Sequence, residues 1–286
     1  MAKVASSVDL VRSQQQRWSE RSIPITIQVG AWISIVILTL PVIVVILAGL
    51  NSGDYLTFPP TGLSLRWVID FLTSPSWMGA YGFSLLLAVI TMAISTILGT
   101  AAAIVLSRVQ FRGRDFLRAY FLSPLILPGV VLGLALYVFY VSTNIGLAGS
   151  MTGLIIGHVL VTCPYVIGTV SAALVSFDVS LEEAARSLGA SPWTAFRKIT
   201  LPNISAGIAA GATFAFIVSF GQFEVSLFLS TPNLTPLPIA LYISLRYTFE
   251  PTAAAAGIFA IMLVVVSMLI VSRLVNFRKF GGLNIS

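Results

Sequence analysis

Long apolar stretches, separated by shorter polar ones, dominate the pattern of this chain. Six of them are long enough to cross about 30 Å of hydrocarbon as helices, which rise about 1.5 Å per residue. Their predicted limits are 27–50, 81–106, 120–141, 152–175, 204–229 and 252–271. The pattern therefore predicts an all-α membrane protein with six transmembrane helices.

Polar stretches frame this six-span region at both ends. Residues 1–26 are predicted to form a cytoplasmic N-terminal arm, residues 27–275 the six-span domain, and residues 276–286 a cytoplasmic tail. Within the third apolar stretch, Pro124 and Pro128 each remove a helical hydrogen-bond donor, so we expect a kink there. Such a kink suits a tightly packed bundle and a gate equally well.

The placement of charge decides how the composition is interpreted. The chain is 57% hydrophobic and 9% charged, whereas charged residues make up about 25% of a typical soluble protein. Its net charge of +6 could suggest a nucleic-acid partner, but every Lys and Arg except Arg66 and Arg246 falls on one side of a six-span arrangement. The positive-inside rule then places both termini, and the loop between the fourth and fifth spans, in the cytoplasm. Lipid is therefore the expected surroundings, and no nucleic-acid partner is needed.

The longest soluble-looking passage, residues 181–202, predicts two short helices joined by a sharp corner. Acidic residues in the first turn suit the helix macrodipole. Gly189 can take the left-handed conformation that ends the first helix. Ser191 and Pro192 suit the N-cap and first position of the second helix, which is not expected to run unbroken through Pro202.

This passage resembles the cytoplasmic coupling loop of permease subunits in binding-protein-dependent ABC importers. The signature of that loop is Glu-Ala-Ala, three residues, Gly, nine residues, Ile, one residue and Leu-Pro. The chain matches it with the full spacing at Glu183, Ala184, Ala185, Gly189, Ile199, Leu201 and Pro202. An ordinary helix-turn-helix between spans is the alternative, but it gives no reason for these matches.

The resemblance implies a type I ABC-importer permease fold and a non-catalytic chain that binds no cofactor. ATP and Mg²⁺ would belong to a cytoplasmic ATPase dimer. A second, related permease and an extracytoplasmic solute-binding protein would complete the importer in a bacterial cytoplasmic (inner) membrane. In this interpretation the coupling loop covers residues 176–202, and its ATPase-coupling residues are Glu182, Glu183, Ala184, Ala185, Arg186, Leu188, Gly189, Ile199, Leu201 and Pro202.

A second resemblance concerns the cargo. Residues 219–228, followed by Leu237-Pro238-Ile239 and Leu245-Arg246, resemble the spermidine/putrescine branch of these permeases, and the two resemblances together cover about 81–275. They imply a small polar solute such as a polyamine, an amino acid or a related organic compound. Polyamine permeases often carry paired acids where this chain has Gly221 and Gln222, so the cargo stays open.

Four polar residues are candidates for the solute pathway: His158, Ser219, Gln222 and Glu224. Glu224 is the carboxylate placed within a span, where ionisable residues are usually functional, although it can also reach the outer water. On a regular helix Gln222 and Glu224 point about 200° apart, so only one of them faces solute unless the helix breaks near Gly221. His158 has no metal partner visible in the sequence, and we favour a packing role for it; no metal site is expected.

Small residues recur every four positions along the fifth span, at Gly207, Gly211, Ala215 and Ser219. This spacing lets helices approach closely. The partner helix is either within this chain or in a second permease subunit.

The alternative function is that of a secondary transporter or channel subunit driven by an ion gradient. Such proteins keep charged residues or paired broken helices within the membrane. The chain has few buried charges, and this alternative does not explain the matched loop. No phosphate-binding Gly-rich loop with Lys and Ser or Thr is present, so the chain is not expected to be an enzyme.

Overall fold

The computed structural model describes residues 25–281, with side chains up to residue 273. In that part, the chain folds into helices joined by loops, with two isolated β-bridges. The predicted arm, residues 1–26, lies outside the described residues except for its last two. The predicted tail, residues 276–286, is described only as helix backbone to residue 281.

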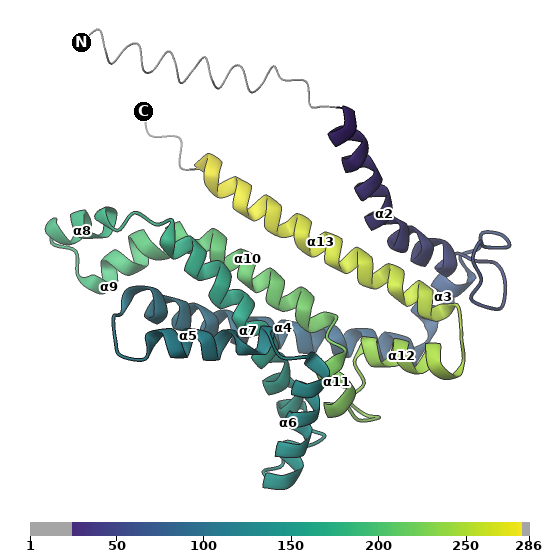
Figure 1. The fold of residues 1–286 in the computed structure, drawn as a ribbon. Helices are drawn as coiled ribbons and strands as arrows, with labels where there is room; N and C mark the ends of the chain where they lie inside the picture. The colour runs from purple at the N-terminus through teal and green to yellow at the C-terminus, as the bar shows by residue number, and fades with distance from the viewer. Residues whose placement is uncertain (1–24, 282–286) are drawn as a thin grey trace.

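Within the described residues, five helices are long and apolar enough to cross a membrane (Figure 1). They are α2 (Ile25–Gly49), α4 (Pro75–Arg108), α7 (Met151–Val175), a continuous helix over Pro192–Phe220 that ends in α10 (Leu201–Phe220), and α13 (Thr252–Gly281). They correspond to all the predicted spans except the third. The prediction of an all-α membrane protein is confirmed.

The third predicted span is not a straight helix. It divides into α5 (Arg114–Leu122), a 3₁₀ turn (Ser123–Leu125) and α6 (Gly129–Thr143). The two arms meet at 102° and make a sixth span only if they are counted as one. Pro124 lies in the 3₁₀ turn and Pro128 caps α6, and neither supplies the backbone N–H that a continuous helix needs. The expected kink is confirmed, and it is a sharp bend between two separate helices.

The fifth predicted span, residues 204–229, is interrupted. The helix α10 ends at Phe220, and α11 (Glu224–Leu229) begins after a short irregular link. Gly221 caps the end of α10, where its low helix propensity favours a break. The apolar stretch 204–229 is therefore not one regular helix. The break lies at Gly221, which is the exception that the sequence left open, so the angle expected on a regular helix does not separate Gln222 from Glu224.

Close approach between α7 and α10 forms the centre of the bundle. A Cβ added to Gly207 would lie 2.5 Å from the Cβ of Ala173, and one added to Gly211 would lie 2.5 Å from Oγ1 of Thr169. Both neighbours belong to α7. The small-residue face of α10 therefore packs against α7 of the same chain. This decides between the two partner helices that the sequence left open.

Two opposite sides of the bundle carry different elements (Figure 1). One side carries α8 (Ser180–Ser187), α9 (Pro192–Ala195) and the end of α4. The other carries α3 (Arg66–Thr73), the start of α4 and α12 (Leu237–Tyr247). With its 34 residues, α4 is about 50 Å long and joins the two sides. The helix α6 projects from the bundle and buries only Gly133 and Tyr140.

Candidate functional site

The predicted corner between the fourth and fifth spans is present, and we call residues 180–195 the elbow. Its first helix, α8, carries Glu182 and Glu183 in the first turn. Gly189 ends it with a φ of +91°. The N–H of Ala190 donates to the carbonyl of Ala185, and that of Gly189 to Arg186, at 3.1 and 3.0 Å. These two bonds form a Schellman motif, in which glycine satisfies the last carbonyls of a helix without steric cost.

The second half of the elbow starts as the sequence predicts. The side chain of Ser191 accepts a hydrogen bond from the N–H of Thr194 at 3.2 Å, and Pro192 is at the start of α9. A serine cap and a following proline both favour a helix start. Because left-handed Gly189 is only two residues before this cap, the chain turns sharply between α8 and α9.

Proline does not stop the second helix. Residues Phe196–Thr200 form a π-helical turn, closed by a hydrogen bond from the N–H of Leu201 to the carbonyl of Phe196. This wider turn accommodates Pro202, which has no N–H to donate, in the first turn of α10. The helix runs on from Pro192 to Phe220. The prediction that it could not pass Pro202 unbroken was wrong, because a π turn was not considered.

Most of the expected coupling residues lie on an exposed surface. Leu188 is 90% exposed and Trp193 is 68% exposed, and both belong to the elbow. Between α8 and α9 lies a shallow hollow of about 480 Å³, lined by Glu183, Arg186, Ser187, Ala190 and Pro192. Among the expected coupling residues, those in exposed positions are Glu183, Ala184, Arg186, Leu188, Gly189, Leu201 and Pro202. Glu182, Ala185 and Ile199 are half-buried.

Glu182 differs from its neighbour Glu183 because its carboxylate points back to the bundle. Its Oε2 accepts hydrogen bonds from Arg108 Nη1 at 2.7 Å and from Thr200 Oγ1 at 2.6 Å. Burial alone would raise the pKa of Glu182, but the hydrogen bonds from Thr200 and Arg108 outweigh it, and the pKa is lowered. The carboxylate is therefore held in its charged form. Sequence reasoning missed Arg108 and Thr200, because contacts 74 and 18 residues away leave no local pattern.

Among the pathway candidates, His158 and Ser219 are buried and bonded to each other. The imidazole Nδ1 of His158 lies 2.9 Å from Oγ of Ser219, and its Nε2 lies 3.0 Å from Oγ of Ser226. Ser226 also donates to the carbonyl of Gln222 at 2.7 Å. This network ties α7 to both sides of the break between α10 and α11. It fits the packing role that we favoured for His158, and sequence reasoning missed Ser226.

The other two candidates lie at the break itself. Gln222 is buried, at 8% exposed. Glu224 begins α11 and lies against Gly129, where a Cβ would be 3.4 Å from the Glu224 Cδ. Its carboxylate thus lies near the N-termini of α6 and α11, where helix dipoles favour negative charge. Within the described residues, the side chains of Gln222 and Glu224 make no hydrogen bond that would account for them as structural residues.

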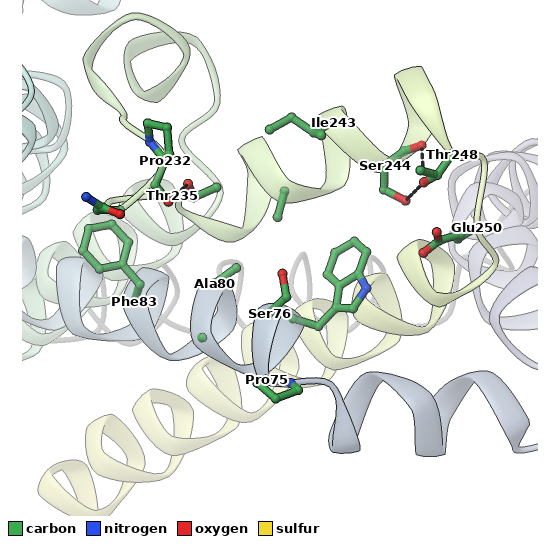
Figure 2. A pocket seen from close by; sticks show the side chains of 14 residues that line it. Pro75, Ser76, Ala80, Phe83, Pro232, Thr235, Ile243, Ser244, Thr248 and Glu250 are labelled. Carbon is green, nitrogen blue, oxygen red and sulfur yellow. Dashed lines mark hydrogen bonds between the residues drawn. The ribbon is translucent and has the colours of Figure 1, made fainter.

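At the end opposite the elbow lies an open cavity of about 690 Å³ (Figure 2). Its walls come from the first turns of α4, the 232–235 loop and α12. Ser244 and Thr248 are hydrogen-bonded on one wall, near Glu250, while Phe83 and Thr235 lie toward the other end. Glu250 is the charged residue among those that line it. The cavity can admit a small polar molecule.

A known family matches the larger part of this helical core. The family described as "Binding-protein-dependent transport system inner membrane component" matches residues 95–281, well over half of the chain. The chain belongs to this family. It is a permease of the ABC-importer type, a multi-pass membrane protein of the transport class, and the secondary-transporter alternative is not supported.

Relatives of this permease point to the polyamine branch. The chain is 30% identical over 245 residues to the spermidine/putrescine transport system permease protein PotC of Escherichia coli strain K12, covering 86% of this chain and 91% of that protein. It is 33% identical over 216 residues to the putrescine transport system permease protein PotI of the same strain, covering 74% and 76%. The resemblance to the spermidine/putrescine branch is confirmed.

Solved structures support the fold of the permease. One is the crystal structure of a bacterial ABC transporter involved in the import of the acidic polysaccharide alginate. A chain of that transporter superposes with a TM-score of 0.64 at 18% identity, covering 95% of this chain and 98% of that one. At this identity the likeness concerns the fold alone. The fold is that of type I importer permeases.

Proposed function

We propose that this permease forms half of the transmembrane pathway of an ATP-driven importer, and that its elbow receives the motion of a cytoplasmic ATPase. The observation that carries this proposal is the elbow itself. Its corner is held by local hydrogen bonds, yet it presents Leu188 almost fully exposed. A stiff apolar projection beside membrane spans has the form of a surface that docks in a partner.

The assembly we propose has an ATPase dimer that binds ATP and Mg²⁺, a second and related permease, and an extracytoplasmic solute-binding protein. The elbow then lies in the cytoplasm of a bacterial cell, and the cavity of Figure 2 opens to the outside. The basic residues support this orientation, since Arg186 is in α8, Arg197 is in the π turn, and Arg108 ends α4 beside them. Alternation between inward and outward states follows differential ATP binding.

The cargo we propose is a small polar organic solute, with a polyamine first among the candidates. The support comes from the relatives, which are named as spermidine/putrescine and putrescine permeases. An amine would also find a carboxylate at Glu250 in the outer cavity and at Glu224 beside the helix break. An amino acid or a related compound is the second candidate, because Gly221 and Gln222 supply no acid at the position where polyamine permeases often have a pair.

Co-purification of the tagged chain with its partners, without crosslinker, tests the proposal. We expect an ATPase to remain bound to the wild-type chain and to be lost when residues 180–195 are replaced by a flexible Gly-Ser linker. Deletion of residues 2–20, in the N-terminal stretch, is the control and is expected to leave the ATPase bound. An ATPase that stays bound without the elbow, or that never binds the wild-type chain, would refute the proposed coupling role.

A further inference from the structure

Arg108 is the last residue of α4, and its guanidinium contacts three segments that are distant in sequence. It donates to Glu182 of α8 at 2.7 Å and to Oγ1 of Thr200, in the π turn, at 3.3 Å. It also lies over the ring of Phe177, with its Cζ 5.7 Å from the ring centroid. One side chain therefore joins α4 to the linker before the elbow, to the elbow's first helix and to the turn behind its second helix.

The three polar partners close a triangle, which we call the brace: Arg108, Glu182 and Thr200. Besides its bond with Arg108, Thr200 donates to the same carboxylate oxygen at 2.6 Å. Thr200 is fully buried, and the side chains of Arg108 and Glu182 are 29% and 16% exposed. An exposed ion pair would contribute little, but this one is partly shielded from water and fixed by a buried hydroxyl.

The brace adds α4 to the helices that move when the elbow is displaced. Along the chain, the elbow is continuous only with α7 before it and with α10 after it. The short linker 176–179 joins it to α7 and is not helical. Through Arg108 the elbow is also attached to α4, a 34-residue helix that packs in the bundle core with α7 and α10. Charge-assisted bonds of this length hold their partners in a fixed geometry.

We propose that Arg108 is a positioning residue that fixes the elbow to α4, so that α4, α7 and α10 move together when a partner displaces the elbow. This inference rests on the proposed function. Without the brace, α8 loses its attachment to α4, and part of the ATPase motion is lost before it reaches that helix. The ATPase then still binds, but fewer solute molecules cross for each ATP hydrolysed.

The first experiment measures whether the brace holds the elbow. A nitroxide is attached at Ser187→Cys in the full chain carrying Cys163→Ser, in lipid nanodiscs. We expect a broad, immobilised spectrum for the otherwise unchanged chain and a narrower, mobile one for Arg108→Gln. Arg112→Gln is the matched control, because Arg112 is an exposed arginine four residues further on. It has no hydrogen bond or ion pair to the elbow in the part of the chain that the structure describes, so it is expected to match the unchanged chain.

The second experiment measures transmission in the complete importer, reconstituted with its ATPase and binding protein in proteoliposomes, with putrescine as the measured solute. We expect Arg108→Gln to lower the solute transported per ATP by about fivefold or more, an order-of-magnitude figure taken from the coupling energies seen between binding sites. Thr200→Val, which removes the hydroxyl that donates to Glu182 and accepts from Arg108 but leaves the ion pair, is expected to give a smaller loss. The exchange Arg108→Glu with Glu182→Arg restores the ion pair and is expected to recover most of the transport per ATP.

The outcomes separate the brace from the proposed function. An immobile label in Arg108→Gln, or an unchanged transport ratio in both Arg108→Gln and Thr200→Val, overturns the inference while the ATPase role stands. The inference is also overturned if Arg108→Glu with Glu182→Arg assembles into the complex but recovers none of the transport per ATP. A wild-type complex in which solute never stimulates ATP hydrolysis refutes the proposed function, and the inference falls with it.

Discussion

Gly189 combines a left-handed backbone with open space around it. Its φ is +91°, and no heavy atom lies within 4 Å of the position that a Cβ would occupy. A substitution there therefore acts through the backbone conformation alone and does not disturb packing. This makes it possible to change the direction of the elbow without damaging the bundle.

We predict that Gly189→Val leaves membrane insertion intact but abolishes transport-coupled ATP hydrolysis. A β-branched residue in the left-handed region costs about 1–2 kcal/mol, and the chain relieves this by redirecting α9. ATPase activity with and without solute, in the reconstituted importer, is the measurement. Gly189→Asn is the matched control, because asparagine tolerates this conformation, and it should retain most of the coupling. Normal coupling in Gly189→Val would argue against a stiff elbow.

The carboxylate of Glu182 predicts how the elbow responds to pH. Because hydrogen bonds from Thr200 and Arg108 lower the pKa of Glu182 against the effect of burial, the charged form stabilises the fold. That contribution is fully present above the ordinary pKa of glutamate, about 4.3. It is lost as the pH falls through the lowered pKa. The elbow should therefore be insensitive to pH near neutrality and should loosen only in acid, below the ordinary pKa of glutamate.

Iodide quenching of Trp193, in a variant that keeps only this tryptophan, can follow the loosening as the pH is lowered from neutrality to well below the ordinary pKa of glutamate. Glu182→Gln should remove the transition. Asp178→Asn is included as a control, because hydrogen bonds from Ser180 also lower the pKa of Asp178. If the transition persists in Glu182→Gln and vanishes in Asp178→Asn, it belongs to the linker and not to the brace.

At the scale of elements, the contact between α7 and α10 decides the stability of the bundle. We predict that Gly211→Ala lowers the thermal unfolding midpoint, because the new Cβ would lie 2.5 Å from Oγ1 of Thr169 and 3.0 Å from Cα of Val166. Overpacking of this kind costs about 1–3 kcal/mol. Gly168→Ala is the control: Gly168 is a glycine of α7 with open space around it, so alanine should leave the midpoint unchanged or raise it.

Equal midpoints for the two variants, measured in one detergent, would mean that α7 and α10 are not in close contact. A second permease subunit would then be the remaining partner for the small-residue face of α10. Fluorescence-detected unfolding of the purified chain gives both midpoints in one experiment.

The elements also show what sequence reasoning could and could not find. The elbow was predictable because its signals are local: a left-handed glycine, a serine cap and a proline lie within four residues. The corner at Pro128 was predictable in position but not in size, since proline removes a hydrogen bond and does not set an angle. The π turn before Pro202 was not predicted, because it depends on a hydrogen-bonding shift that no single residue signals.

Contacts between distant residues account for most of the remaining differences. His158 was named as a candidate, but its bonds to Ser219 and Ser226 join residues more than 60 positions apart. Arg108 was visible only as one of several basic residues in a loop, where the positive-inside rule expects them. Its contact with Glu182 depends on how α4 and α8 come together in three dimensions.

At the scale of the whole molecule, the two ends of the bundle carry different chemistry. The elbow end has most of the described basic residues and an exposed apolar projection, and the opposite end has Arg66, Arg246 and the cavity beside Glu250. About 50 Å of α4 separates them, so any coupling between ATP and solute must travel the length of the bundle. The brace and the packed α4–α7–α10 core provide a continuous route for that motion.

Site-specific photo-crosslinking tests the central claim most directly. A photoreactive amino acid is placed at Leu188, which is 90% exposed on the elbow, or at Tyr247, which is 78% exposed at the opposite end. In the intact importer, the account predicts that Leu188 crosslinks to the ATPase and that Tyr247 does not. An ATPase captured from Tyr247, or a wild-type complex in which Leu188 captures only lipid, would contradict it.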